Sequence, residues 1–332
     1  MKKILNDPFA YVDETIDGLC LAFPQYYERT APGARVIKRP GPARAGKVGL
    51  VSGGGSGHLP VFTGYVGPGL LDACAIGEVF ASPSVEQMVE AMRAANGGAG
   101  VLRLYGNYGG DVMNFDMAGE MMEMEDVPTS SVKLADDIAS AAPAEAAKRR
   151  GVAGIVYAYK IAGAAAEAGA DLAEVTRIAQ AAADACRTVG VALTPCTVPQ
   201  AGRPTFTIAE DEMEIGMGIH GEPGVRRGKL HTADVIAAEM LDMQLTDRPI
   251  AKGDRVSVLV NSLGATPAEE LFILYRQVHA RLTALGATIV MPLVGRYACS
   301  MEMAGVSFTI IKLDAELERL LKAPAECAFW RV

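Results

Sequence analysis

Hydrophobic runs alternate with glycine-rich turns and amphipathic segments through the first half of the chain. Residues 84–95 have helical spacing with Ser84 placed as the cap, and the Ala-rich segments near 161–169 and 172–189 predict further helices. The strand-like hydrophobic runs cover residues 47–52, 70–76, 100–105 and 152–157. Strand, turn and helix in repetition predict an α/β fold whose first sheet is mainly parallel.

The pattern changes after residues 199–204, where alternating and continuous hydrophobic runs are mixed. The predicted strands of this part cover residues 213–218, 255–261, 287–291 and 307–313, and the predicted helices cover 234–243 and 267–285. Hairpin-like and crossover connections together predict a second α/β domain with a mixed sheet. We place the domains at residues 1–190 and 191–332, with the boundary near 185–205.

Composition narrows the class of protein. The 332 residues carry a net charge of −8 without a basic stripe, which argues against nucleic-acid binding. Six scattered cysteines without a Cys-x-x-Cys pair are typical of buried thiols in a reducing compartment. No apolar run approaches the roughly 18 residues of a membrane span, and Pro8 interrupts the N-terminus before any signal-like core. A cytoplasmic protein without membrane contact is therefore expected.

Two glycine-rich loops mark the candidate ligand site. Residues 53–57 and 106–110 each follow a predicted strand, and parallel α/β sheets bind ligands at the carboxyl ends of their strands. Glycines let backbone amides approach a small polar ligand closely. The first loop matches neither the dinucleotide nor the P-loop pattern. A tight turn without any ligand remains the alternative for this loop taken alone.

Three side chains in or beside glycine-rich turns are candidates for chemistry. His58 closes the first loop, Asp111 follows the second, and His220 lies in a Gly- and Pro-rich turn at 218–224. A neutral imidazole in such a turn can act as base, ligand or nucleophile, whereas a metal site lacks further ligands at useful spacing. Asp111 is equally compatible with capping a helix and with accepting a substrate proton.

Several motifs occur together and in order. They are Gly53-Gly54-Gly55-Ser56-Gly57-His58, Gly77-Glu78-Val79-Phe80-Ala81-Ser82-Pro83, Gly110-Asp111-Val112-Met113-Asn114-Phe115, Gly218-Ile219-His220-Gly221-Glu222-Pro223-Gly224 and Asn261-Ser262-Leu263-Gly264-Ala265-Thr266-Pro267. In this order they resemble the substrate-binding K subunit of dihydroxyacetone kinases over nearly the whole chain. The resemblance is more specific than any single motif.

The resemblance implies a two-domain α/β homodimer in which His220 adds to the ketone carbonyl of a short hydroxyketone, giving a hemiaminal. Glycerol and other polyols have no carbonyl and would be rejected. Asp111 would accept the proton of the hydroxyl that is phosphorylated, and His58 would bind the substrate and assist proton transfer. The remaining substrate-binding positions implied are Gly55, Ser56, Gly57, Ser82 and Gly110.

The resemblance also implies what the chain lacks. A K subunit binds no nucleotide or metal itself, so ATP or ADP with Mg would sit on a separate L-type subunit. That partner would carry either exchangeable ATP or a bound ADP recharged by the phosphotransferase system, through its M subunit.

Two positions depart from the family pattern. The family's usual Gly-His-Glu-Pro has Leu59 in place of the acid, and the usual Lys-Asn-Tyr-Thr-Gly-Asp begins here with Gly106. Loss of the lysine enlarges and neutralises the pocket, which favours a larger ketose such as erythrulose or a branched tetrulose. The alternative function is a non-catalytic ketose sensor or coactivator of a transcription regulator, which has no need of Asp111 as a base. An unrelated polar-ligand binder fits the ordered motifs poorly.

Overall fold

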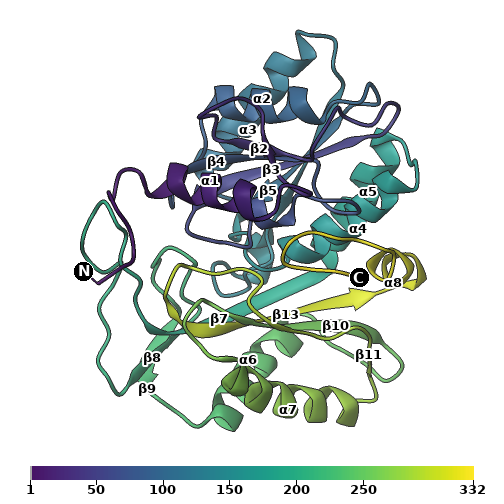
Figure 1. Ribbon diagram of the computed structural model, residues 1–332. Helices are drawn as coiled ribbons and strands as arrows, with labels where there is room; N and C mark the ends of the chain where they lie inside the picture. Colours follow the sequence, from purple (N-terminus) through teal and green to yellow (C-terminus); the bar gives the residue numbers. More distant parts are fainter. Residues whose placement is uncertain (1) are drawn as a thin grey trace.

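The computed structural model describes residues 2–332 and contains two β-sheets, one above the other in Figure 1. The first sheet has the strand order β1-β2-β4-β3-β5-β6, with β4, β3, β5 and β6 parallel and β2 antiparallel to β4. Its strands are β1 (Glu28–Arg29), β2 (Val36–Lys38), β3 (Gly49–Ser56), β4 (Ala73–Val79), β5 (Val101–Gly106) and β6 (Thr129–Leu134). The prediction of a mainly parallel first sheet is confirmed.

The second sheet is mixed, as predicted, with the order β11-β10-β13-β7-β8-β9 and β12 also paired with β10. Its strands are β7 (Cys186–Thr194), β8 (Glu212–Ile215), β9 (Arg226–Lys229), β10 (Arg255–Ser262), β11 (Thr288–Ile289), β12 (Leu293–Gly295) and β13 (Ala304–Leu313). β7 belongs to this sheet from Cys186 onward. The division of the chain into domains at residue 190 stays a prediction.

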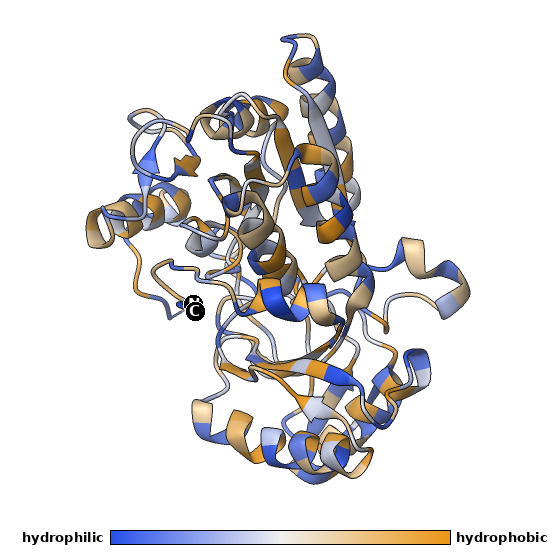
Figure 2. Ribbon diagram, turned by 90° about the vertical axis from the view of Figure 1, so that its right-hand side faces the viewer, coloured by the Kyte–Doolittle hydropathy of each residue, from blue (hydrophilic) through white to orange (hydrophobic). Residues whose placement is uncertain are grey.

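The helices form layers outside and between the two sheets (Figures 1 and 2). α2 (Val85–Ala95) and α3 (Gly109–Glu123) pack on the first sheet, whereas α6 (Ala233–Asp247) and α7 (Ala268–Ala284) cover the outer face of the second. The elements that pack between the sheets or beside them are α1 (Tyr11–Ala22), α4 (Ile155–Glu167), α5 (Leu172–Ala185), α8 (Ala315–Leu321) and the short 3-10 helices Thr63–Tyr65 and Pro143–Lys148.

One predicted strand is wrong. Residues 152–157 were expected to form a strand, but α4 begins at Ile155 and every residue from Ile155 to Ala166 is buried. A helix packed on all sides has no polar stripe, so its apolar run looks like that of a buried strand. The buried Asp136 accepts hydrogen bonds from the N–H groups of Val152 and Gly154, which leads the chain into the helix.

Two smaller differences concern strand positions. The predicted helix 172–189 ends at Ala185, because the chain turns into β7. β6 was not predicted, since Thr129, Ser130 and Ser131 at its start make it more polar than its parallel neighbour β5.

The prediction at Ser84 is confirmed, because its side chain caps α2 in a reciprocal capping box with Gln87.

Two expectations from composition can be checked against the fold. All six cysteines are free thiols, five of them buried, as their scattered positions predicted. Within residues 2–332, no helix combines the length and apolar character needed to cross a membrane.

Candidate active site

A pocket of about 330 Å³ lies where several loops from the two sheets meet. The predicted glycine-rich loop 53–57 is mostly strand, because Gly53 to Ser56 form the carboxyl end of β3, and residues 106–110 lead from the end of β5 into α3. β3 and β5 are parallel neighbours, so both glycine-rich segments lie at the same edge of the first sheet. The loop after β8 reaches this edge from the second sheet and carries His220. The residues of the pocket used below are Gly55, His58, Phe80, Ser82, Gly106, Tyr108, Gly109, Gly110, Asp111 and His220.

His220 is held by a carboxylate on one side and by aromatic rings on the others. Its Nδ1 lies 2.8 Å from Oε1 of Glu222, and the other oxygen of that carboxylate accepts a hydrogen bond from the backbone N–H of His220. Partial burial raises the pKa of Glu222, but the hydrogen bond and charge of His220 outweigh it and lower this pKa to about 2. The rings of Tyr108 and Phe80 stand edge-on to the imidazole, at 5.0 and 5.3 Å between centroids.

His58 faces His220 across the pocket. The two Nε2 atoms are 3.1 Å apart, and Nδ1 of His58 lies 2.7 Å from the backbone carbonyl oxygen of Cys299. His58 is buried and stacks on Phe80, with 4.9 Å between ring centroids. Burial, followed by the charge of His220, lowers the pKa of His58 to about 3. His58 is therefore neutral at physiological pH.

Asp111 lies on the first turn of α3 and points into the pocket. Tyr108 is the N-cap residue of α3, and the Asp111 side chain accepts a hydrogen bond of 2.5 Å from the Ser82 hydroxyl. The interpretation of Asp111 as the helix cap is therefore wrong. Burial raises its pKa to about 6, although the Ser82 hydrogen bond and His220 both act in the opposite direction. A carboxylate with this pKa is a stronger base than an ordinary aspartate.

The predicted substrate-binding positions fall into two groups. Gly55, Ser82 and Gly110 line the same pocket as the two histidines. Ser56 and Gly57 line a smaller neighbouring cavity of about 30 Å³, and so does Leu59. The change from the family's glutamate to Leu59 therefore lies outside the main pocket.

Gly55 is required by close packing. A Cβ on this residue would lie 2.6 Å from the backbone nitrogen of Ala81, a distance that side-chain carbons do not tolerate. Gly109 is different, because a Cβ there would meet nothing within 4 Å. A Cβ on Gly106 would lie 3.2 Å from the Tyr108 ring. Of these two positions, only the exposed Gly109 leaves open space, at the rim of the pocket.

Sequence reasoning did not single out Glu222, Tyr108 or Phe80. Glu222 follows His220 by two residues in a turn that contains Pro223, and this short spacing was the available signal. Arg150 supports the carboxylate from 3.9 Å and is itself paired with Asp137 at 2.8 Å. These longer-range contacts have no counterpart in the sequence pattern.

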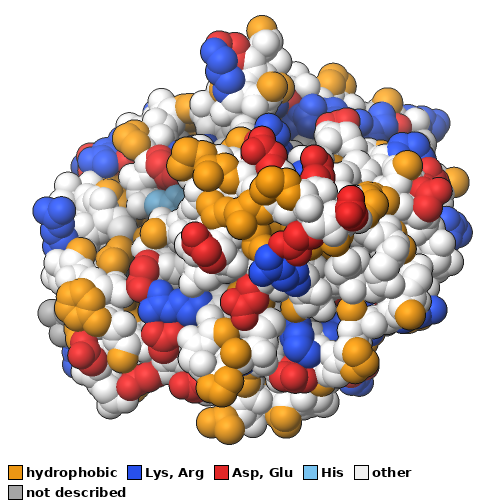
Figure 3. Space-filling model, turned by 90° about the horizontal axis from the view of Figure 1, so that it is seen from above, with side chains coloured by type: hydrophobic (Ala, Val, Ile, Leu, Met, Phe, Trp, Pro, Cys, Tyr) orange, Lys and Arg blue, Asp and Glu red, His pale blue; other side chains and the backbone are white. Residues whose placement is uncertain are grey.

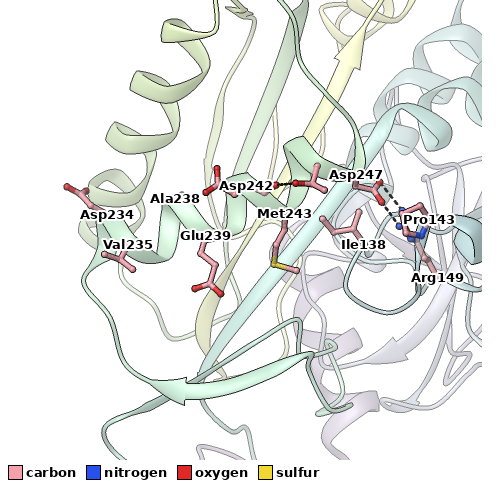
Figure 4. Close-up of a pocket in the computed structure, with 11 residues that line it drawn as sticks. Ile138, Pro143, Arg149, Asp234, Val235, Ala238, Glu239, Asp242, Met243 and Asp247 are labelled. Carbon is pink, nitrogen blue, oxygen red and sulfur yellow. Dashed lines mark hydrogen bonds and ion pairs between the residues drawn. The ribbon is translucent and has the colours of Figure 1, made fainter.

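A larger groove of about 800 Å³ runs along α6, away from the histidines. Figure 4 shows its acidic side chains along the helix, with Asp247 directed towards Arg149. Asp234 and Asp242 also pair with arginines, at 2.5 and 2.6 Å. The groove brings together no nucleophile and base comparable to His220 and Asp111, so the smaller pocket is the candidate active site.

The amino-acid sequence is similar to two kinase proteins over nearly its whole length. It is 46% identical over 326 residues to the D-erythrulose kinase of Mycolicibacterium smegmatis, covering 98% of this chain and 56% of that protein. It is 44% identical to the dihydroxyacetone-binding subunit DhaK of PTS-dependent dihydroxyacetone kinase 1 of Listeria innocua, covering 99% of this chain and 100% of that subunit. The chain thus spans about half the length of the erythrulose kinase and all of the DhaK subunit.

Solved structures give the same result. The dihydroxyacetone kinase of C. freundii, in complex with AMP-PNP and Mg²⁺, superposes with a TM-score of 0.90 at 33% identity, over 99% of this chain and 61% of that one. The operon co-activator Dha-DhaQ superposes with a TM-score of 0.88 at 30% identity, over 96% of this chain and 97% of that one. The Dak1 domain matches residues 17–329. The chain belongs to the Dak1 family, whose members include the DhaK dihydroxyacetone-binding subunits.

Proposed function

We propose that this chain is the substrate-binding subunit of a ketose kinase and captures a short hydroxyketone as a hemiaminal on His220. A separate L-type subunit would carry ATP or ADP with Mg and transfer the phosphoryl group, in some systems after recharging by the phosphotransferase system. The observation that carries the proposal is the pairing of His220 with Glu222 on Nδ1 and with His58 on Nε2. Because Glu222 occupies Nδ1, the nitrogen left to react is Nε2, which faces His58 inside the pocket.

The hydrogen-bond partners define where the ring protons lie. Carboxylate and carbonyl oxygens only accept, so Nδ1 of His220 and Nδ1 of His58 both carry protons. The facing Nε2 atoms would then present two lone pairs at 3.1 Å, which is unfavourable unless one further proton lies between them.

This shared proton balances the capture step. As substrate enters, this proton moves fully onto Nε2 of His58, and the lone pair on Nε2 of His220 attacks the ketone carbon. The carbonyl π electrons move to the oxygen, which takes the proton from His58 and becomes the hemiaminal hydroxyl. His220 ends as an alkylated imidazolium, and its positive charge lies beside Glu222.

The charge of Glu222 should therefore favour capture. In Glu222→Gln the amide oxygen still accepts from Nδ1, but the ion pair with the imidazolium is lost. A hydrogen bond to a charged group contributes about 1.5–3 kcal/mol, so we expect roughly 10- to 100-fold more ketose to be needed for half-maximal adduct. Intact-protein mass spectrometry across a ketose titration measures this. Glu210→Gln, at an exposed acid, is the matched control, and equal titrations of the two variants would remove Glu222 from this role.

Asp111 would act in the second step. Its carboxylate accepts the proton of the substrate hydroxyl while that oxygen attacks the phosphoryl group on the L subunit. Ser82 orients the carboxylate through the hydrogen bond to Oδ1. A ketose sensor would need capture by His220 but no such base. The base at Asp111 therefore favours a kinase subunit over a sensor, although a co-activator is among the structural relatives.

The free space at Gly109 supports a substrate with a fourth carbon. A hydroxymethyl group added to dihydroxyacetone would fit at the rim of the pocket beside Gly109, where the family's threonine would otherwise stand. Relatives named as erythrulose kinases are 43–46% identical to this chain. We therefore propose erythrulose or a branched tetrulose as the preferred substrate.

Filling this space should reverse the preference. In Gly109→Thr we expect kcat/KM for erythrulose to fall roughly 10- to 100-fold relative to dihydroxyacetone, because a methylene-sized clash costs about 1–3 kcal/mol. A coupled assay with both ketoses and excess L subunit measures the ratio. Gly18→Thr on α1 is the control, since a Cβ there also meets nothing within 4 Å. A wild-type protein that prefers dihydroxyacetone would contradict the proposed substrate.

A further inference from the structure

A row of exposed methionines runs along α3 away from the pocket. Met113, Met117 and Met121 are 60%, 50% and 36% exposed, which is high for apolar side chains on a packed helix. They follow one another at intervals of four residues and therefore share one face of α3. We refer to these three residues as the methionine row.

The methionine row is continuous with the rim of the pocket. Gly110 lines the pocket, is exposed, and precedes Met113 by three residues on the same helical face. From Gly110 to Met121 the row extends about 16 Å along the helix, at about 1.5 Å per residue. A molecule that delivers a phosphoryl group to a hydroxyl beside Asp111 must approach this rim, so it would also cover the beginning of the row.

Acidic side chains border the methionine row. Asp116, Glu120 and Glu123 are exposed and form a second line on the neighbouring face of α3, spaced by four and three residues. Figure 3 shows hydrophobic side chains gathered on the surface seen from above, with acidic side chains among them. An apolar centre with a charged rim is the usual arrangement of a protein interface, and flexible methionines adapt well to a partner surface.

We propose that the methionine row and its acidic border are a docking surface for the nucleotide-carrying subunit. The inference rests on the proposed function, because that function requires a partner at the rim of the pocket. The partner's contact surface would be an apolar patch edged by lysine or arginine. Two other occupants fit less well. A second copy docked by two-fold symmetry would bring acidic borders together, and an anionic lipid surface would be repelled by them.

A charge placed in the methionine row tests the proposal. For the double variant Met117→Glu and Met121→Glu, the half-maximal rate should require at least about tenfold more of the purified L-type subunit with ATP and Mg²⁺. The rate at saturating L subunit and the yield of ketose adduct should stay unchanged. The double variant Met117→Leu and Met121→Leu should behave as wild type. Phe272→Glu, at an exposed residue of α7, is the matched control for surface charge.

A second measurement does not depend on the charged variant folding. In the wild-type protein, saturating L subunit should slow hydrogen-peroxide oxidation of Met117 and Met121, read by peptide mass spectrometry. Unchanged oxidation together with an unchanged half-maximal L concentration would overturn the docking surface and leave the proposed function intact. If wild-type protein forms the adduct but no L subunit supports phosphorylation, the kinase function fails and the docking proposal fails with it.

Discussion

Replacing His220 with alanine should abolish the covalent ketose adduct. Nε2 of His220 is the only nucleophile proposed for the carbonyl, and alanine offers no atom that can form the bond. Without capture the hydroxyl is no longer held at Asp111, and loss of positioning commonly lowers rates by about 100-fold or more. We therefore expect no mass increase in intact-protein spectra, and at least about 100-fold lower kcat/KM with the L subunit.

The controls for this experiment follow from the chemistry. Wild-type protein should gain the mass of one ketose in spectra recorded under non-denaturing conditions, and should gain nothing from glycerol, which has no carbonyl. His279→Ala, at an exposed histidine of α7, should keep the adduct. A wild-type protein without any adduct at saturating ketose would refute covalent capture. An adduct retained by His220→Ala would place the bond on another residue.

Replacing Asp111 with asparagine should separate capture from phosphoryl transfer. The amide nearly matches the carboxyl in shape and can still accept the Ser82 hydrogen bond, so the pocket and the adduct should persist. It cannot accept the substrate proton, and losing a general base typically costs roughly 10²- to 10⁴-fold. We expect wild-type adduct yield with phosphorylation reduced by this factor, measured by a coupled assay at saturating ketose.

The pH dependence gives an independent check on Asp111. Burial raises its pKa to about 6, so the carboxylate is ionised above that pH and protonated below it. The wild-type rate should fall about tenfold per pH unit below about 6, and Asp111→Asn should lose this inflection. Equal turnover by wild type and Asp111→Asn would remove Asp111 from catalysis and favour a sensor. Asp126→Asn, at an exposed residue outside the pocket and the proposed docking surface, is the control.

Local sequence patterns determined much of the first sheet. Hydrophobic runs that end in glycine-rich segments predicted β3 and β5, and both segments lie at the same edge of the sheet, although Gly53 to Ser56 belong to β3 itself. This succeeds because strands of a parallel sheet end on a common side, so a local motif carries information about position. The cap at Ser84 was equally readable, since a helix cap depends only on residues within one turn of α2; the return bond from Gln87 came from the structure.

Only the tertiary structure decided that the run at 152–157 leads into a helix. Its surroundings on every side are apolar, and a local pattern cannot tell a helix buried on all sides from a buried strand. The role of Asp111 at the start of α3 was also ambiguous locally. Its bond to Ser82, 29 residues earlier in the chain, shows that it does not cap the helix.

For the site, the sequence alone determined which residues could act, and the structure decided how they are arranged. His58 and His220 stood out because each lies in a glycine-rich turn, yet 162 residues separate them. Their contact depends on two sheets meeting at one edge, and their ring protons depend on Glu222 and the Cys299 carbonyl. Hydrogen bonds between distant segments leave no periodic trace in a sequence, because any pair of polar residues can make them once the fold brings them together.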